Sequence, residues 1–233
     1  MSTDKYLLYI NKYGSRSFND TNQYPIFPWL IRFNEENKRI PRNLKYPMAA
    51  QIETNKDFLM KRYIDDEDNN SKFPYHFGTH YSTSAYVYFY LMRIEPFTSL
   101  LIKLQGNKQE DADRMFYSFD DILSILNNGR DNREVIPELF NNVEIYLNLN
   151  CSDFGIKKNK ERIDDFNLEK NIKKNNTNIY QYIKFVFDNK KYLNDKKIAN
   201  EINNWIDIIF GVEQLPKNKE RKKKGFNIFY KES

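Results

Sequence analysis

The segment Tyr24-Pro25-Ile26-Phe27-Pro28-Trp29 constrains the fold of this chain more than any other. Two prolines three residues apart exclude a helix here, and they also remove hydrogen-bond donors from any sheet ladder. Four large apolar side chains within the same six positions nevertheless require burial. We therefore predict a buried, extended strand without regular hydrogen bonding, whose backbone groups depend on side chains from elsewhere in the chain.

The rest of the sequence is apolar enough to enclose such a strand. The 233 residues include 18 Phe and 17 Tyr, and 40% of all residues are hydrophobic. This composition excludes wholesale disorder, and the length suits a single domain spanning residues 1–233. No internal repeat of about 20 to 50 residues is present, which excludes a solenoid or a propeller.

Several features indicate a cytoplasmic protein. The longest mostly apolar run, around residues 85–92, is far shorter than the ~20 residues of a membrane-spanning helix. Residues 1–11 lack the basic start, apolar stretch and cleavage site of a secretory signal. The single cysteine, Cys151, cannot form an internal disulfide, which suits a reducing compartment.

The formal net charge of +5 comes from one end of the chain. Residues 217–233 hold seven of the 37 basic and two of the 32 acidic residues, which leaves 30 of each in residues 1–216. The neutral body has no electrostatic footprint for nucleic acid. The basic loop 217–224 could contact an anionic membrane or RNA, or it could simply be solvated, and all three interpretations stay open. Its basic residues are Lys217, Lys219, Arg221, Lys222, Lys223 and Lys224.

Apolar periodicity predicts that the chain is mainly helical, especially in its C-terminal half. The expected helices cover residues 81–92, 110–126, 137–148, 180–187 and 198–209. The helix over 81–92 should be buried, and the one over 110–126 should be amphipathic and should stop at Asn127-Asn128-Gly129. Pro137 suits a first helical turn, and Gly211 caps the last helix. Polar composition predicts loops over residues 34–43, 65–72 and 150–169.

His76 and His80 are the only histidines, and they raise the question of a metal site. On a helix they would share one face as metal ligands, with Glu95 or Asp113 as a third ligand, which would favour a metal-dependent or acyl-transferring hydrolase. However, Phe-Gly-Thr between them is a poor helix core. The alternative is that both imidazoles satisfy buried backbone groups of the neighbouring irregular segment, with no metal and no cofactor.

Arg93 and Glu95 follow an apolar element directly and point to the same side of an extended chain. The segment from Arg16 to Asp20 offers complementary charges. We hypothesise that Arg93 pairs with Asp20, or Glu95 with Arg16, and that the buried pair replaces a sheet ladder around the Pro-rich strand. If so, Arg93→Ala or Asp20→Ala abolishes soluble expression.

Ordered segments along nearly the whole chain resemble the signature segments of BEACH domains. The N-terminal ones are Gly14-Ser-Arg16-Ser-Phe18-Asn19-Asp20, Gln23-Tyr24-Pro25-Ile26-Phe27-Pro28-Trp29, His76-Phe-Gly78-Thr79-His80-Tyr81-Ser82, Arg93-Ile-Glu95-Pro96-Phe97-Thr98, Leu104-Gln105-Gly106 and Ala112-Asp113-Arg114. The C-terminal ones are Ile136-Pro137-Glu138-Leu139-Phe140, Asn150 with Phe154-Gly155, Trp205-Ile-Asp207-Ile-Ile209-Phe210-Gly211 and Asn227-Ile-Phe229-Tyr230. Their length, order and separation make this resemblance far more specific than a single short motif. Residues that carry it, and are expected to be structural, include Arg16, Asn19, Asp20, Trp29, His76, His80, Arg93, Glu95 and Trp205.

The resemblance implies a mostly α fold with a core of extended irregular segments and little regular β-sheet. It implies no catalysis and no cofactor, but a protein-interaction scaffold in vesicle traffic, lysosome-related membrane dynamics or autophagy. In the family a PH-like domain packs against this domain in cis and leaves a groove for protein partners. Candidate groove residues are Tyr24, Phe27, Arg93 and Glu95. The family would extend further at both ends, so we expect the chain to lack its extreme N- and C-terminal segments.

Overall fold

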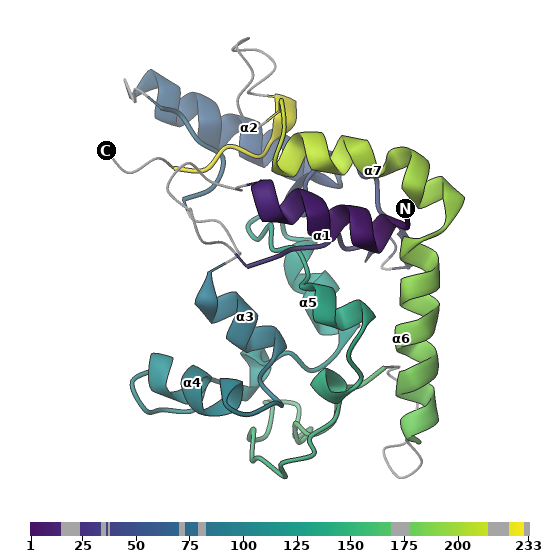
Figure 1. The fold of residues 1–233 in the computed structure, drawn as a ribbon. Coiled ribbons are helices and arrows are strands. Elements are labelled where there is room, and N and C mark those ends of the chain that lie inside the picture. The colour runs from purple at the N-terminus through teal and green to yellow at the C-terminus, as the bar shows by residue number, and fades with distance from the viewer. Residues whose placement is uncertain are drawn as a thin grey trace. The chain divides into compact units, whose positions relative to one another are not determined.

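The computed structural model of the chain describes residues 1–14, 24–33, 36, 38–69, 73–78, 83–168, 178–213 and 224–230. Seven α-helices (α), four 3-10 helices (η) and two strands (β) are assigned in these ranges (Figure 1). In order they are α1 Thr3–Tyr13, β1 Ile31–Phe33, β2 Arg39–Pro41, η1 Met48–Ala50, α2 Glu53–Asp68, α3 Ser84–Tyr90, α4 Phe97–Leu104, η2 Ala112–Arg114, α5 Phe119–Leu126, η3 Pro137–Phe140, η4 Glu144–Tyr146, α6 Ile179–Leu193 and α7 Lys196–Ile209.

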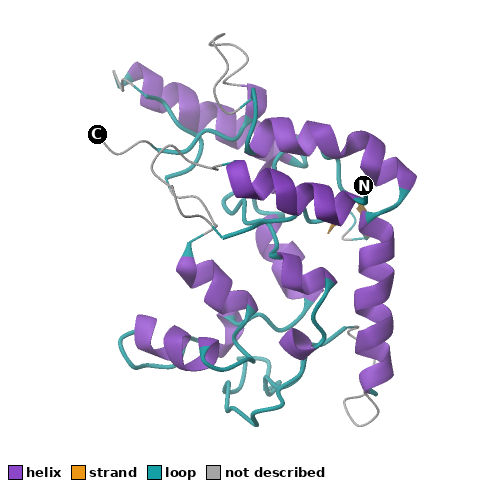
Figure 2. Cartoon of the chain, in the orientation of Figure 1, coloured by secondary structure: helices purple, strands orange, loops and turns teal. Residues whose placement is uncertain are grey.

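Helices and irregular segments make up nearly all of the described chain (Figure 2). Within the described ranges the single sheet is the antiparallel pair β1–β2, in which Arg32 lies opposite Ile40. The predicted class, mostly α with little regular β-sheet, is therefore confirmed. No helix in these ranges is both long enough and apolar enough to cross a bilayer.

The chain divides into two compact units that interleave in sequence. The first unit comprises residues 1–82, 123–135 and 193–233, and the second comprises residues 83–122 and 136–192. That the whole chain behaves as one folding domain stays a prediction.

In the first unit, α1 and α7 lie side by side and run in the same direction (Figure 1). At their starts, the Asp4 amide donates to Asn194 Oδ1 at 3.4 Å. At their ends, a Cβ on Gly14 would lie 2.8 Å from a ring carbon of Phe210, so no larger residue fits there without displacing that ring. The buried face of α7 holds Ile198, Ile202, Trp205, Ile208 and Ile209, as its apolar periodicity predicts.

The C-terminal segment closes a second core of the first unit against α2. Buried there are Ala49, Ala50, Leu59, Phe77, Phe226 and Phe229. Phe77 and Phe229 form an isolated parallel bridge, and the Tyr230 amide donates to the Phe77 carbonyl at 2.8 Å. Residues about 150 positions apart in the sequence thus share one core.

The second unit is built around aromatic rings. Phe166 is fully buried, and its ring centroid lies 4.6 Å from Phe116, 4.9 Å from Phe119 and 5.3 Å from Tyr146. The Tyr182 hydroxyl on α6 donates to the Phe166 carbonyl at 3.0 Å. Phe166 lies in the stretch 150–169, which is irregular as predicted but contributes to the core.

The single amphipathic helix predicted over residues 110–126 is wrong in its first half. A 3-10 turn at η2 is followed by an extended stretch, and α5 begins only at Phe119. The carbonyls of Phe116 and Tyr117 accept bonds from Arg93 and Asn167, so tertiary partners use groups that a continuous helix would need. The predicted stop is confirmed, since Gly129 has a φ of 74°.

Three further boundary predictions are wrong. The acidic residues 65–68 are the last turn of α2 and not a loop, because this end of the helix continues from a buried face at Leu59 and Tyr63. Residues 39–41 form β2. The helix expected from Pro137 to about residue 148 is two separate 3-10 turns, η3 and η4.

The predicted apolar stripe of α6 forms a helix but is not the buried face. Tyr180 and Phe187 are 71% and 65% exposed, whereas Tyr182 and Val186 are buried. Periodicity therefore identified the helix correctly, and an apolar face of α6 is left open to solvent.

Candidate functional site

The Pro-rich strand is buried and extended as predicted, and its backbone is satisfied by distant residues. Phe27 forms a two-bond bridge with Val135, with N···O distances of 2.7 and 3.0 Å. Asn11 on α1 bonds both backbone groups of Ile26, donating to its carbonyl at 2.8 Å and accepting from its amide at 2.9 Å. A single amide side chain thus replaces a pair of ladder bonds.

Trp29 is the next anchored residue of this strand. Its amide donates to Glu134 Oε2 at 3.1 Å, and its indole Nε1 donates to the Arg133 carbonyl at 3.1 Å. Its carbonyl accepts from Arg42 Nη1 at 3.3 Å. Three polar groups of one buried residue therefore depend on Arg42, Arg133 and Glu134.

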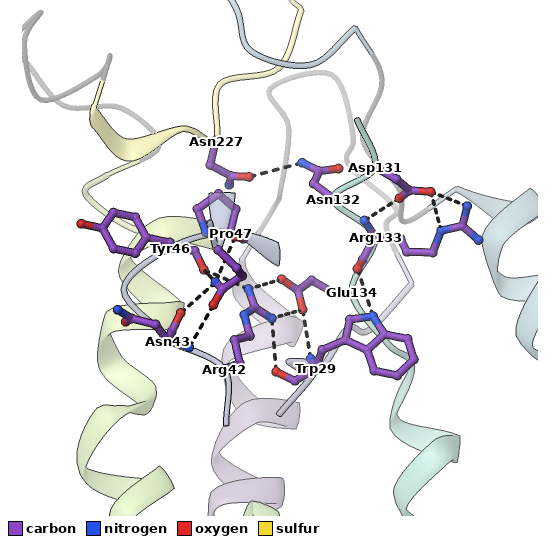
Figure 3. A network of polar contacts seen from close by, with 11 residues as sticks. Trp29, Arg42, Asn43, Tyr46, Pro47, Asp131, Asn132, Arg133, Glu134 and Asn227 are labelled. Atoms are coloured by element: carbon purple, nitrogen blue, oxygen red, sulfur yellow. Dashed lines mark hydrogen bonds and ion pairs between the residues drawn. The ribbon is translucent and has the colours of Figure 1, made fainter. Parts of the chain in front are cut away.

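Arg42 and Glu134 form a fully buried, two-pronged ion pair. Nη1 lies 2.6 Å from Oε2, Nη2 lies 2.7 Å from Oε1, and both side chains are 0% exposed. Arg42 also donates to the Tyr46 carbonyl at 3.2 Å, and Figure 3 shows its guanidinium between the carboxylate and the two carbonyls. This pair ties the Pro-rich strand to the segments around residues 42–47 and 131–135.

Gln51 and Asn227 extend this polar network. Gln51 Nε2 donates to the carbonyls of Asn43, Tyr46 and Pro47, and its Oε1 accepts from the Asn43 amide. Asn227 Nδ2 donates to the Ile208 carbonyl at 3.0 Å. Gln51 thus links the irregular residues 43–47, and Asn227 ties the C-terminal segment to α7.

His76 is fully buried and contacts backbone and aromatic rings. Its Nδ1 accepts a bond from the Ile228 amide at 3.2 Å, and the ring centroids of Tyr63 and Phe226 lie 4.9 and 5.8 Å away. The lone pair of Nδ1 is therefore used by the backbone. Among the described residues no group of three or more His, Cys, Asp or Glu side chains could hold a metal ion. His80 lies outside the described residues, so its role stays a prediction.

Arg93 is the central buried polar residue of the second unit, with 1% of its surface exposed. Its Nε donates to the Asp164 carbonyl at 2.9 Å, and its Nη1 donates to the Phe116 carbonyl at 2.7 Å. The rings of Phe154 and Phe166 lie 5.8 and 5.9 Å from the guanidinium carbon. The guanidinium thus bridges two irregular segments inside an aromatic cage.

The burial of Arg93 is energetically costly. Desolvation lowers the pKa of Arg93 from its usual value to about 10, an effect that the charges of Asp165 and Asp164 partly offset. No ion pair joins Arg93 to a carboxylate in the ranges that the structure describes. The hypothesised partner Asp20 lies outside those ranges, so its pairing with Arg93 stays a prediction. A buried pair of Glu95 with Arg16 is wrong, because Glu95 is exposed.

The predicted groove residues differ in exposure. Tyr24 is half-buried, and Phe27, in the same unit, is completely buried. In the second unit Arg93 is buried, whereas Glu95 is exposed and accepts from the Ser99 amide at 3.3 Å. The buried side chains of Phe27 and Arg93 therefore offer no surface to a partner, whereas those of Tyr24 and Glu95 are accessible. The groove itself stays a prediction.

The remaining predicted residues fall partly outside the described ranges. Trp205 is fully buried on α7, 5.7 Å from the Phe210 ring. Of the basic loop only Lys224 is described, and it is exposed. Not described are Arg16, Asn19, Asp20, His80, Lys217, Lys219, Arg221, Lys222 and Lys223.

Sequence reasoning missed Asn11, Arg42 and Glu134. It predicted that side chains would serve the Pro-rich strand, but assigned that role to Arg93 and Glu95. Arg42 and Glu134 are 92 positions apart and sit among 69 charged residues, and nothing local marks them as buried. The available signal is weak: Arg42 follows Pro41, and Glu134 precedes the apolar pair at 135–136.

A titration of Tyr146 tests the core of the second unit. Its hydroxyl donates to the Leu139 carbonyl at 2.8 Å, and burial raises the pKa of Tyr146 well above its usual value of 10.0. Since the unfolded chain ionises first, the contribution of this group to stability is present below about pH 10 and is lost as the pH rises further.

We therefore expect Tyr146→Phe to be about 1 kcal/mol less stable than the parent near pH 8, because the Leu139 carbonyl loses its donor. The difference in unfolding free energy should narrow above about pH 10, since phenylalanine cannot ionise in the unfolded chain. Urea unfolding of both proteins across this range measures the difference. A constant difference would contradict the burial of Tyr146.

The family follows from a comparison of the whole sequence. The family model of the Beige/BEACH domain matches residues 1–233. The chain belongs to the BEACH domain family. The resemblance of the signature segments is thereby confirmed, and the buried polar links described above belong to a BEACH domain.

Curated relatives are much longer than this chain. The BEACH domain-containing protein lvsD of Dictyostelium discoideum is 36% identical over 99% of this chain and 8% of its own length. Beige protein homolog 1 of Saccharomyces cerevisiae is 36% identical over 90% of the chain and 10% of its own length. The lysosomal-trafficking regulator of Drosophila melanogaster is 31% identical over 97% and 6% respectively. The chain thus spans a tenth or less of the length of these relatives.

Proposed function

We propose that this BEACH domain is a non-catalytic protein-interaction scaffold of vesicle traffic, lysosome-related membrane dynamics or autophagy. It acts in the cytoplasm, peripheral to membranes. The family match and the name of the lysosomal-trafficking regulator support the field of action. The use of buried charged groups as links between backbone segments supports a structural role for the residues that could otherwise suggest an enzyme.

The observation that carries the interaction role is the apolar face of α6, which we call the α6 stripe. Ile179, Tyr180, Ile183 and Phe187 are between 46% and 71% exposed and recur at helical spacing on one side. A contiguous apolar surface of this kind is typical of protein-binding sites. We propose that its occupant is a PH-like domain of the same polypeptide, which the family resemblance implies, and the much greater length of the relatives is consistent with such neighbours.

Binding of a PH-like domain of the family, supplied in trans, tests this proposal. Calorimetric titration should show that Tyr180→Asp/Phe187→Asp weakens binding at least tenfold, because burying each ring contributes about 1.5–3 kcal/mol. Leu149→Asp/Ile156→Asp alters two exposed apolar residues elsewhere in the same unit and should leave binding unchanged. Equal affinities for the parent and both variants, or no binding by the parent, would refute the assignment of the α6 stripe.

A further inference from the structure

Helix α1 presents a second exposed face, of different chemistry from the α6 stripe. Lys5, Leu8, Tyr9, Lys12 and Tyr13 are all exposed, and their spacing puts them on one side of the helix. The opposite side, with Thr3, Asp4, Leu7 and Asn11, is buried. We call these five exposed residues the α1 face.

The α1 face combines amphipathic aromatic residues with cations. Leu8, Tyr9 and Tyr13 are 45%, 56% and 70% exposed. The Tyr9 and Tyr13 rings lie edge to face at 5.2 Å, and Lys12 Nζ lies 5.5 Å from the Tyr13 centroid. Tyrosine has an apolar ring and a polar tip, and lysine can extend its charge beyond its apolar stem. Both side chains therefore suit an interface between an apolar phase and water.

The charges of α1 are sorted between its two sides. Its one carboxylate, Asp4, lies on the buried side. The neighbouring start of α7 adds exposed Lys196 and Lys197, beside the exposed carboxylate of its N-cap residue Asp195. The α1 face itself therefore carries two lysines and no carboxylate.

We propose that the α1 face docks on an anionic lipid bilayer. Lys5 and Lys12 would reach the headgroup phosphates, and Leu8, Tyr9 and Tyr13 would enter the boundary between headgroups and acyl chains. Charge complementarity favours lipid over a protein groove, because the centres of protein interfaces are depleted of lysine, whereas interfacial membrane helices are rich in it. The proposal is independent of partner docking at the α6 stripe, which lies on a different helix.

Vesicle co-sedimentation tests the proposal. The parent protein should bind vesicles of phosphatidylcholine and phosphatidylserine, but not vesicles of phosphatidylcholine alone. Lys5→Glu/Lys12→Glu should lower the partition coefficient at least tenfold, since each lysine near an anionic surface contributes roughly a factor of five. The matched control Lys103→Glu/Lys108→Glu makes the same charge change at two exposed sites of the second unit. This control should change the partition coefficient less than twofold.

A second variant separates insertion from diffuse attraction. Tyr9→Ala/Tyr13→Ala should also weaken vesicle binding several-fold, and raised salt should strongly weaken vesicle binding by the parent. Thermal melting of every variant confirms that it is folded. Three results would overturn the proposal: no vesicle binding by the parent, a loss of binding in the control as large as in Lys5→Glu/Lys12→Glu, or lipid binding unaffected by the tyrosine changes. Loss of PH-like domain binding by the α1 variants with intact lipid binding would identify the face as a protein contact instead.

Discussion

Arg42→Ala is expected to lower the free energy of unfolding by about 3–5 kcal/mol, because it takes the guanidinium away from the buried carboxylate of Glu134. The carbonyls of Trp29 and Tyr46 lose donors in the same substitution. Typical domains are stable by only about 5–15 kcal/mol, so the variant should be largely insoluble or should unfold at low urea concentration.

Arg162→Ala is the matched control for this change. Arg162 pairs with Asp153 at 3.4 Å, but both side chains are exposed. An exposed ion pair contributes about 0–1 kcal/mol, so this variant should be nearly as stable as the parent. If Arg42→Ala costs no more than Arg162→Ala in urea unfolding, the buried pair is not what holds the Pro-rich strand.

Replacing both partners separates the ion pair from the network around it. In Arg42→Met/Glu134→Leu no buried charge is left unpaired, and an isolated pair replaced in this way often costs little. Here the amide and carbonyl of Trp29 would still lose Glu134 and Arg42. We therefore expect the double variant to stay at least about 2 kcal/mol less stable than the parent, since buried backbone groups without partners cost about 1–3 kcal/mol each.

The Pro-rich strand shows how far sequence alone can lead. Two prolines and four large apolar side chains were enough to predict a buried strand without a ladder, since proline chemistry and burial are local properties. The identity of its partners was not predictable, because Asn11, Arg42 and Glu134 come from three separate segments. Pairing over such distances is decided by the fold, and charged residues at many other positions have the same local appearance.

Apolar periodicity accounts for both the correct and the wrong helix predictions. Apolar spacing gave α6 and α7 correctly, because a run of about four turns repeats the pattern often enough to define it. It joined η2 to α5, since the extended residues between them happen to continue the stripe. It also could not reveal that Tyr180 and Phe187 face solvent, because periodicity identifies a face without stating what covers it.

Arg93→Ala is the second substitution with a large expected effect, again about 3–5 kcal/mol of unfolding free energy. It removes the donors to the Phe116 and Asp164 carbonyls and leaves a cavity between the Phe154 and Phe166 rings. Arg114→Ala, at an exposed arginine of the same unit, should change stability by less than about 1 kcal/mol.

Two companion variants show which property of Arg93 matters. Arg93→Met keeps much of the volume without donors, and Arg93→Lys keeps the charge but lacks the planar fork that serves two carbonyls at once. If the planar guanidinium is what holds the irregular segments, Arg93→Lys should be only slightly more stable than Arg93→Ala. Arg93→Met should lose nearly as much unfolding free energy as Arg93→Ala. Stability close to the parent in Arg93→Lys would contradict this role.

Asp20→Ala tests the hypothesised ion pair separately from the carbonyl bonds. A double-mutant cycle with Arg93→Ala measures the coupling free energy between the two side chains. A direct buried pair predicts coupling well above about 1 kcal/mol, whereas independent effects predict additive losses. Because the bonds to Phe116 and Asp164 already account for a large loss in Arg93→Ala, only the coupling can establish Asp20 as a partner. Additive losses would leave the carbonyl bonds as the sole role of Arg93 and would refute the pairing.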